Sequence, residues 1–221
     1  MISLRPHSKR EVMTDPAPQS MSQKLQTIRT FRVATPADAA GCREIYAPFC
    51  AADSPVSFEL EAPSEAEMGS RIGSTLQSLP WLVAAGVGGK ILGYAYASPH
   101  MARPAYRWSV NVSIYLHPDA RRQGLGSNLY KKLFGILREL GYCNAYAGIT
   151  LPNEGSLALH RHLDFLEVGV YARVGYKCGV WHDVAWWGLS LQNHPEQPAE
   201  PVLFPHYLDS IGSEALLALL A

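Results

Sequence analysis

Apolar and polar residues alternate along residues 106–116, and this two-residue period predicts a β-strand. The alternation stops at Pro118, a residue that breaks strands. A turn containing Gly124 and Gly126 follows. Beyond the turn, leucines recur at helical spacing on one face, at Leu129, Leu133, Leu137 and Leu140. The middle of the chain is therefore predicted to be a strand, a glycine turn and a helix in direct succession.

Before this centre, the pattern predicts a strand, two helices and a β-hairpin. Thr35 followed by Pro36, and Ser64 followed three positions later by Glu67, are typical of helix N-termini. Gly88-Gly89 is typical of a hairpin turn. The loop between the two helices is long enough to close over a ligand. The strands are expected at residues 27–33, 81–87 and 91–97, and the loop at residues 51–63.

After the central helix, the pattern predicts a strand, a helix and a final pair of strands, at residues 144–149, 153–163, 168–175 and 180–191. Residues 1–27 combine basic residues with Ser, Pro and Gln and are expected to be a disordered N-terminal extension. Residues 192–221 are expected to be a C-terminal tail, with a candidate short helix at residues 211–220. From their composition, both tails are expected to be dispensable for ligand binding.

Composition narrows the functional classes. The 221 residues carry 19 basic and 19 acidic side chains, so net charge offers no basis for binding nucleic acid or an anionic membrane. No apolar run approaches the length of a membrane span. The four cysteines are scattered, which predicts reduced thiols and a cytoplasmic protein. Cys178 and His182 stand four residues apart without further ligands nearby in sequence, so no metal site is predicted.

The glycine turn predicts an anion site. The first backbone N–H groups of a helix lack intrahelical partners, and the helix dipole favours negative charge there. A phosphate loop of the Walker type needs a Lys between Gly and Ser, but here Gly126 is followed directly by Ser127. A dinucleotide fingerprint needs a third glycine where this chain has Leu129. An ordinary helix start with a glycine-rich cap remains the alternative.

Four motifs carry a family resemblance. The run Arg121-Arg122-Gln123-Gly124-Leu125-Gly126 resembles the R/Q-x-x-G-x-G/A signature of the GNAT acetyltransferases. Three further stretches, A-R-P-A-Y-R-W from Ala102, L-P-N-E-G-S-L-A-L-H from Leu151, and G-Y-K with W-H-D-V near the end, resemble the phosphinothricin-type subfamily. The resemblance spans residues 28–191. It implies an α/β (α+β) GNAT acyl-CoA N-acyltransferase fold, with a mixed sheet of about seven strands and about four helices.

The resemblance also implies an acetyl-CoA site. The backbone of Ile114, Tyr115 and Leu116 would pair with the pantetheine arm, although a buried strand would have the same sequence. Asn153 and Ser156 would lie near the thioester, with a plain helix cap as the alternative for Asn153. His160 would donate a proton or hydrogen bond, with a structural helix histidine as the alternative. The pyrophosphate would lie on Arg122, Gln123, Gly124, Leu125, Gly126 and Ser127.

For the acceptor, the resemblance implies the amine of a small amino-acid-like molecule, of the phosphinothricin or methionine sulfoximine type. Arg103 and Tyr106 could bind its carboxylate, although a solvated Arg is the simpler interpretation. Phe58 could line the amine pocket, although a core Phe is equally consistent with the sequence. Acetylation of protein N-termini or lysines is less favoured, because the loop around Phe58 suggests a small pocket. A homodimer is a further expectation.

Two positions depart from the family pattern. Asn111 stands where the subfamily has its proposed general-base Glu, and Asp164 replaces a turn glycine. An amide lacks the basicity of a carboxylate, so Asn111 is expected to limit the rate and Asn111→Glu to raise it. The same departure leaves an alternative function open, that of an acyl-CoA-binding protein with weak or no catalysis.

Overall fold

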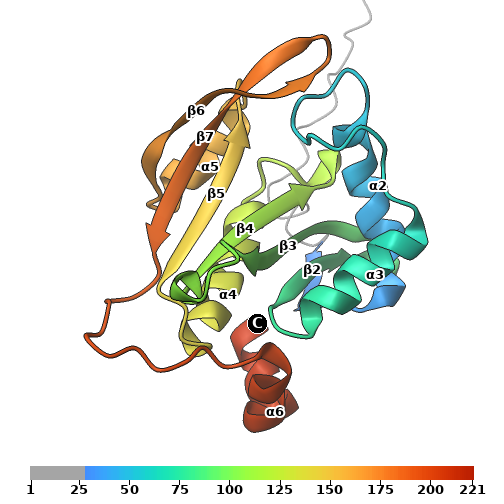
Figure 1. The fold of residues 1–221 in the computed structure, drawn as a ribbon. Helices are drawn as coiled ribbons and strands as arrows, with labels where there is room; N and C mark the ends of the chain where they lie inside the picture. The colour runs from blue at the N-terminus through green and yellow to red at the C-terminus, as the bar shows by residue number, and fades with distance from the viewer. Residues whose placement is uncertain (1–27) are drawn as a thin grey trace, which may run out of the picture.

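The computed structural model describes residues 28–221, so the expected N-terminal extension lies outside the described residues. Seven strands form one sheet in the order β1-β2-β3-β4-β5-β7-β6 (Figure 1). Within the described residues, β4 and β5 are the one parallel pair, and the other neighbours are antiparallel. The strands are β1 (Ile28–Val33), β2 (Trp81–Gly86), β3 (Ile91–Pro99), β4 (Ser109–Leu116), β5 (Asn144–Thr150), β6 (Leu166–Lys177) and β7 (Val180–Ser190).

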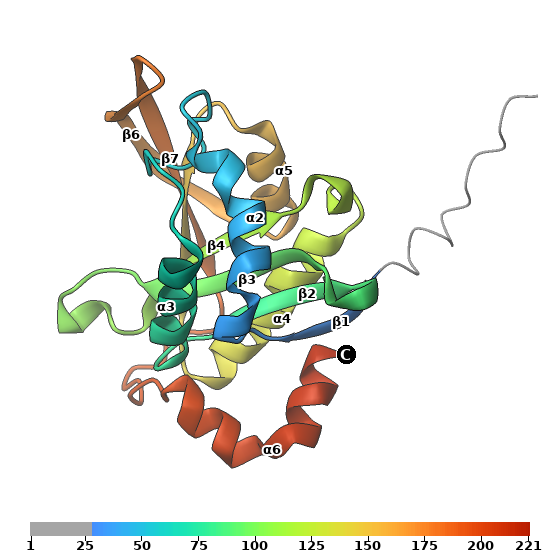
Figure 2. The same cartoon turned by 90° about the vertical axis from the view of Figure 1, so that its right-hand side faces the viewer.

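Helices cover both faces of the sheet. They are α2 (Ala39–Cys50), α3 (Glu65–Leu76), α4 (Leu125–Glu139), α5 (Glu154–His162) and α6 (Phe204–Leu220). One apolar cluster joins α2 and α3 to one face, and a larger cluster joins α4, α5 and α6 to the other, as the two views agree (Figures 1 and 2). The predicted GNAT fold is confirmed, with five α-helices instead of about four.

Local sequence signals set several boundaries. Ser64 and Glu67 form the predicted capping box, with the Ser64 backbone N–H donating to Glu67 Oε2 at 2.7 Å. The strand predicted from residue 106 instead begins at Ser109, because Pro104–Tyr106 forms a short 3₁₀ turn. Asp164 keeps the turn where the family has glycine: its φ is 63°, in the left-handed region that Asp tolerates better than most residues.

The predicted alternation along β4 divides its side chains between the two faces. Val110 and Val112 are buried in the cluster beneath α4. Tyr115 points to the other face, where its ring lies 4.9 Å from that of Tyr46 and 5.4 Å from that of Phe49 on α2. Asn111 has the same parity as Tyr115 and shares its face. Any ligand chemistry at Asn111 therefore takes place on the α2 side of the sheet.

Strands β4 and β5 separate soon after they meet. Their pairing is limited to Ser109 with Asn144, Val110 with Ala145, and Asn111 with Tyr146. Beyond these pairs, β4 stays bonded to β3 as far as Leu116, and β5 stays bonded to β7 as far as Thr150. The strands diverge visibly in Figure 1. The sheet thus has a wedge-shaped opening whose apex is the Asn111–Tyr146 pair.

The C-terminal segment is a substantial part of the fold. Helix α6 is 17 residues long and contains a kink at Gly212, with φ 71°. Phe204, Tyr207 and Leu220 are buried in the cluster beneath α4, and the Phe204 N–H donates to the Ser78 carbonyl at 3.1 Å. This burial was not expected from the composition of the segment. We therefore propose that residues 192–221 belong to the same folded unit as residues 28–191, and that they are not dispensable.

Candidate functional site

The free edge of β4 is the first feature of the site. We use this name for the backbone of residues 112–116 on the side facing β5, because no strand of the described chain pairs with it. Unpaired N–H and C=O groups of an extended strand can bond an extended ligand that carries amides. Ile114, Tyr115 and Leu116, the residues predicted to hold the pantetheine arm, form the distal part of this edge.

The turn after β4 leads directly into the N-terminus of α4. Gly124 is the N-cap residue, with φ 77°, and no side chain caps the helix. The N–H groups of the first turn, from Leu125 to Ser127, therefore point away from the helix without intrahelical partners. Arg121 and Arg122 are exposed beside them. This arrangement suits a pyrophosphate at the end of the free edge of β4.

Two members of the predicted phosphate loop have structural roles. Gln123 donates from Nε2 to the Asp119 carbonyl at 2.6 Å, which fixes the turn. Leu125, the first residue of α4, is buried in the core, whereas Ser127 is half-buried in the same helical turn. Gln123 and Leu125 can thus contribute backbone groups to a ligand, but their side chains serve the fold.

The two glycines of the turn have different reasons to be glycine. Gly126 belongs to the predicted pyrophosphate loop, but it is buried. A Cβ there would lie 3.3 Å from Leu116 Cδ1 and 3.3 Å from Leu159 Cδ2. A Cβ on Gly124 would meet nothing within 4 Å. Gly126 therefore allows α4 to pack against β4 and α5, whereas a side chain at Gly124 would extend into open space.

Asn153 and Ser156 form the cap of α5. Asn153 Oδ1 accepts a hydrogen bond from the Ser156 backbone N–H at 3.1 Å, which is the usual N-cap contact. The Ser156 carbonyl in turn accepts from His160 Nδ1 at 2.8 Å. The Asn153 side chain and the Ser156 backbone thus have local structural roles, as the simpler alternative for Asn153 predicted. A contact with the cofactor remains a prediction for the amide NH₂ of Asn153, which makes no hydrogen bond within residues 28–221.

His160 lies in the protein interior. It is 2% exposed, its ring packs edge-on against Tyr130 and Phe165, and its Nε2 lies 3.5 Å from the Tyr130 hydroxyl. Burial lowers the pKa of this imidazole, and the hydrogen bond to the Ser156 carbonyl opposes that shift. With both nitrogens engaged and no exposed surface, His160 has the geometry of a structural histidine. The alternative that a proton passes through it to a ligand is not favoured by this position.

Because its folded pKa is lowered, His160 should make folding pH-dependent. The unfolded chain binds a proton below the ordinary histidine pKa of about 6.5, while the folded chain resists it. The free energy of unfolding should therefore fall as the pH drops below about 6.5, by up to about 1.4 kcal/mol per pH unit for this one group. Urea unfolding from pH 7.5 to 5 should show a smaller slope for His160→Gln. Equal slopes would contradict the assignment.

Asn111 has a hydrogen-bonded partner that the sequence analysis did not identify. Its Oδ1 lies 2.8 Å from Nδ1 of His100, the residue that directly follows β3. The antiparallel β3–β4 ladder pairs Ser98 with Asn111 and so brings the two side chains together. A local sequence pattern could not reveal this pair, since the partners are eleven residues apart on two strands. The position of the family Glu is thus occupied by an Asn–His pair.

The candidate acceptor residues lie at two ends of one surface. Phe58, in the loop after α2, lies over Gly175 of β6, and its ring centroid is 6.2 Å from that of His182. Tyr106 lies at the other end, 6.0 Å from the His100 ring. Arg103 is exposed in the same 100–108 loop and has no carboxylate partner within residues 28–221.

A row of β7 side chains connects these two ends. His182, Val184 and Trp186 alternate along the strand and so share one face, with Phe58 next to His182. The Trp186 ring lies 6.2 Å from that of His100. A span of four strand residues is about 13 Å. This row therefore connects Phe58 to the apex of the wedge along one face of β7.

Lys177 holds the loop that carries Phe58. It is 4% exposed, and its Nζ donates to the Ser57 carbonyl at 2.8 Å and to the Glu59 carbonyl at 2.9 Å. It also reaches the last carbonyls of α2, at 3.4 Å for Phe49 and 3.2 Å for Cys50. The Lys177 carbonyl is itself bonded by His182 Nε2 at 2.9 Å. The G-Y-K and W-H-D-V segments thus fix the position of the loop against the β6–β7 hairpin.

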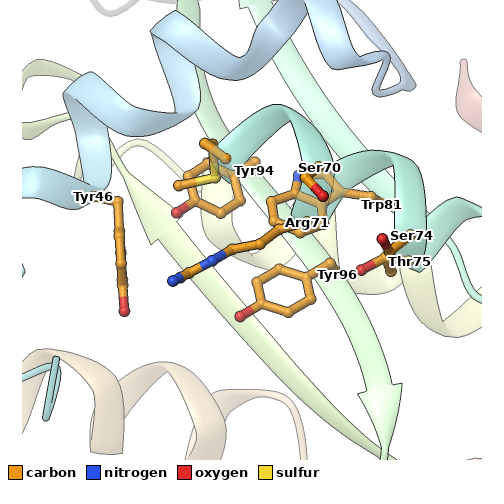
Figure 3. Close-up of a pocket in the computed structure, with 9 residues that line it drawn as sticks. Tyr46, Ser70, Arg71, Ser74, Thr75, Trp81, Tyr94 and Tyr96 are labelled. Carbon is orange, nitrogen blue, oxygen red and sulfur yellow. The ribbon is translucent and has the colours of Figure 1, made fainter. Parts of the chain in front are cut away.

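An aromatic cavity of about 360 Å³ lies between α3 and strands β2 and β3 (Figure 3). The Trp81 and Tyr96 rings stack at 4.1 Å in its wall, and the guanidinium of Arg71 extends toward Tyr46. Arg71 also makes a bidentate ion pair with Glu59, at 2.7 and 3.0 Å. Because Tyr96 pairs with Ser113 of β4, the cavity borders the same face as Asn111. Its remaining lining residues are Met68, Ser70, Ser74, Thr75 and Tyr94.

The described part of the chain offers neither a metal-binding cluster nor a membrane-spanning helix. No group of three or more His, Cys, Asp or Glu side chains in residues 28–221 is arranged to hold a metal ion. Among the described helices, none combines the length and the apolar character that crossing a membrane would require.

Known proteins resemble this chain in sequence and in fold. The model of the acetyltransferase (GNAT) family matches residues 40–165, more than half of the chain. The chain belongs to the GNAT acetyltransferase family. In this GNAT protein, the matched region contains the wedge between β4 and β5, the α4 N-terminus and the cap of α5.

Individual relatives agree with the resemblance to the phosphinothricin-type subfamily. A phosphinothricin N-acetyltransferase from Streptomyces viridochromogenes is 37% identical over 172 residues, covering 77% of this chain and 93% of the relative. An L-methionine sulfoximine/L-methionine sulfone acetyltransferase from Pseudomonas aeruginosa is 36% identical over 115 residues, covering 52% and 67%. A crystal structure of a phosphinothricin acetyltransferase from Sinorhizobium meliloti in complex with acetyl-CoA superposes with a TM-score of 0.72 at 35% identity, covering 80% of this chain and 98% of that chain.

Proposed function

We propose that this protein transfers the acetyl group of acetyl-CoA to the amine of a small amino-acid-like molecule, of the phosphinothricin or methionine sulfoximine type. The observation that carries the proposal is the free edge of β4, which runs from the α4 N-terminus back to the Asn111–His100 pair. An acyl-CoA laid along it would have its phosphates at one end and its thioester at the other. The relatives of this protein that are named above act on acceptors of this class.

The acceptor would lie on the β7 surface between Phe58 and Tyr106. We propose that Phe58 closes one end and that Arg103 takes the acceptor carboxylate through two parallel hydrogen bonds. The loop of Phe58 is fixed by Lys177 and not free to swing, which favours a small acceptor over a protein chain. Acetylation of protein N-termini or lysines is therefore a weaker candidate.

The test is an acceptor screen by mass spectrometry. The protein is incubated with acetyl-CoA and, separately, with free amino acids, phosphinothricin, methionine sulfoximine, and peptides with free N-termini or lysines. We expect N-acetyl products from one or more of the small amino-acid-like amines and none from the peptides. Binding of acetyl-CoA by calorimetry without any product would instead support the non-catalytic alternative.

We also propose a homodimer that uses the outer edge of the sheet. Strand β6 ends the sheet and exposes a run of large apolar residues, which is unusual unless the surface has a partner. The run comprises Leu166, Val168, Val170, Tyr171, Val174 and Tyr176, which are 45–75% exposed. Light scattering at micromolar concentration should give twice the chain mass, and Val170→Glu should reduce it to the monomer mass. Glu167→Gln, on the same exposed strand, serves as the matched control, and a monomeric natural protein would contradict the proposal.

The thiols bear on the location of the protein. Cys42, Cys50 and Cys143 are buried, Cys178 is exposed, and all four are free. Burial raises the pKa of Cys42 to about 12, which keeps that thiol protonated and unreactive. We propose a cytoplasmic location, because an exposed free thiol persists best in a reducing compartment.

A further inference from the structure

The Asn111–His100 pair has a defined hydrogen-bond direction. Asn111 Nδ2 donates to the Pro99 carbonyl at 3.4 Å, so its Oδ1 faces His100 Nδ1 at 2.8 Å. An amide oxygen can only accept, so His100 must donate from Nδ1. The neutral imidazole then carries its lone pair on Nε2. The pair therefore presents a basic nitrogen of fixed tautomer.

Three aromatic side chains hold the His100 ring in place. The Tyr146 ring of β5 stacks on it at 4.4 Å, and Trp186 of β7 and Tyr106 approach edge-on at 6.2 and 6.0 Å. The residue is half-buried, so one part of the ring stays accessible to a small molecule. Of the titratable side chains, the phenols of Tyr106 and Tyr146 face this ring, and no ion pair within residues 28–221 involves it.

The pair lies where the reacting atoms should meet. Asn111 and Tyr146 are the last residues at which β4 and β5 pair, so they mark the apex of the wedge. From Leu116, whose side chain lies against Gly126 of α4, the free edge of β4 leads back to this apex over five residues, or about 17 Å. An extended acyl arm with its phosphates at α4 would therefore bring its thioester toward His100.

We propose that His100 is the general base of the acetyl transfer and that Asn111 is its positioning residue. The inference rests on the proposed function. His100 Nε2 takes one proton from the acceptor ammonium, directly or through one water. The freed amine lone pair forms the C–N bond to the thioester carbonyl carbon, and the C–S bond breaks with its electron pair moving to sulfur. The second proton of the nitrogen goes to that thiolate, and His100 returns its proton to solvent.

This arrangement changes the meaning of Asn111. From sequence, the amide signalled a missing base. In the structure, it accepts from a histidine that can supply the base, in the same way that a third group orients the imidazole of a nucleophile–histidine pair. The base is supplied by His100 after β3 instead of by a carboxylate on β4, so the same site still contains a base. We accordingly expect Asn111→Glu to give no acceleration.

The experiment measures kcat/KM against pH with the best acceptor from the screen. His100→Gln should lower kcat/KM by about 10²- to 10⁴-fold and change the shape of the pH profile. Asn111→Ala should lower kcat but keep the shape of the profile, since the histidine remains. Imidazole added to His100→Gly should restore part of the rate, which a purely structural role could not explain. Calorimetry should give an unchanged acetyl-CoA Kd for His100→Gln.

The control is His162→Gln, which changes an exposed histidine of α5 and should leave the profile intact. If His100→Gln keeps the natural rate while Asn111→Glu raises it, His100 is not the base. The inference then fails while the proposed function stands. If His100→Gly is not rescued by imidazole at any concentration, the inference also fails. If the natural protein acetylates none of the amines, the proposed function fails first, and the inference fails with it.

Discussion

Gly124→Asp is expected to weaken acetyl-CoA binding by about 10- to 100-fold, and Gly124→Asn to weaken it far less. Both side chains tolerate a positive φ, both are good N-cap residues, and a Cβ at Gly124 meets nothing within 4 Å. Both variants should therefore carry the same backbone strain at this positive φ and fold equally well as each other. They differ in charge alone, and the aspartate would stand against the pyrophosphate.

Calorimetry at two salt concentrations measures this effect. The ratio of the two Kd values isolates the charge, because bulk and loss of glycine are common to both variants. The ratio should shrink as salt rises, since exposed charges are screened. Equal affinities for the two variants would place the phosphates elsewhere. A test at Gly126 would be less informative, because any side chain there disturbs the packing of α4 on Leu116 and Leu159.

Lys177→Met should lower the free energy of unfolding by about 3–5 kcal/mol. The variant removes the ammonium that bonds the carbonyl groups of Cys50, Ser57 and Glu59 at a buried site. The Phe49 carbonyl also loses this contact but keeps the Ser57 N–H as a donor. The loop that carries Phe58 should loosen as a result. The KM for the acceptor should therefore rise in protein that remains folded, while the acetyl-CoA Kd should stay the same.

Urea unfolding and steady-state kinetics check this prediction. Lys131→Met is the matched control, because Lys131 is exposed on α4 and should change stability by less than about 0.5 kcal/mol. A loss no larger than that of the control would mean that these carbonyls are satisfied in another way. An equal rise in KM for both substrates would mean that the loop affects the whole site and not the acceptor end.

Sequence periodicity was sufficient to predict most helices and strands, including the strand, turn and helix at the centre of the chain. Each of these is determined by residues close together in the sequence. The Ser64 capping box was predictable for the same reason. Four motifs in order were sufficient for the family. The structural roles of particular residues were harder to predict from the sequence. Gly126 matches a phosphate motif, yet its surroundings come from Leu116 and Leu159, which only the folded chain brings to it.

Contacts between distant residues account for what sequence reasoning missed. Lys177 meets carbonyls about 120 positions earlier, so no local pattern marks it as a structural cation. His100 is recognised as a partner of Asn111 only through the register of β3 against β4. His160 fits the motif of a proton donor, but its burial follows from Tyr130 and Phe165 on other elements. The C-terminal helix was underestimated because burial of Phe204 depends on a surface made by the rest of the chain.

The short β4–β5 pairing has a mechanical consequence. Three residue pairs join a block of four strands to a block of three, so few strand hydrogen bonds cross the centre of the sheet. A ligand in the wedge would act as the missing length of strand, bonding the first block and filling the gap to the second. Ligand binding to the folded state alone raises apparent stability in proportion to the logarithm of its concentration. The resistance of this molecule to heat and proteolysis would then report the supply of acetyl-CoA around it.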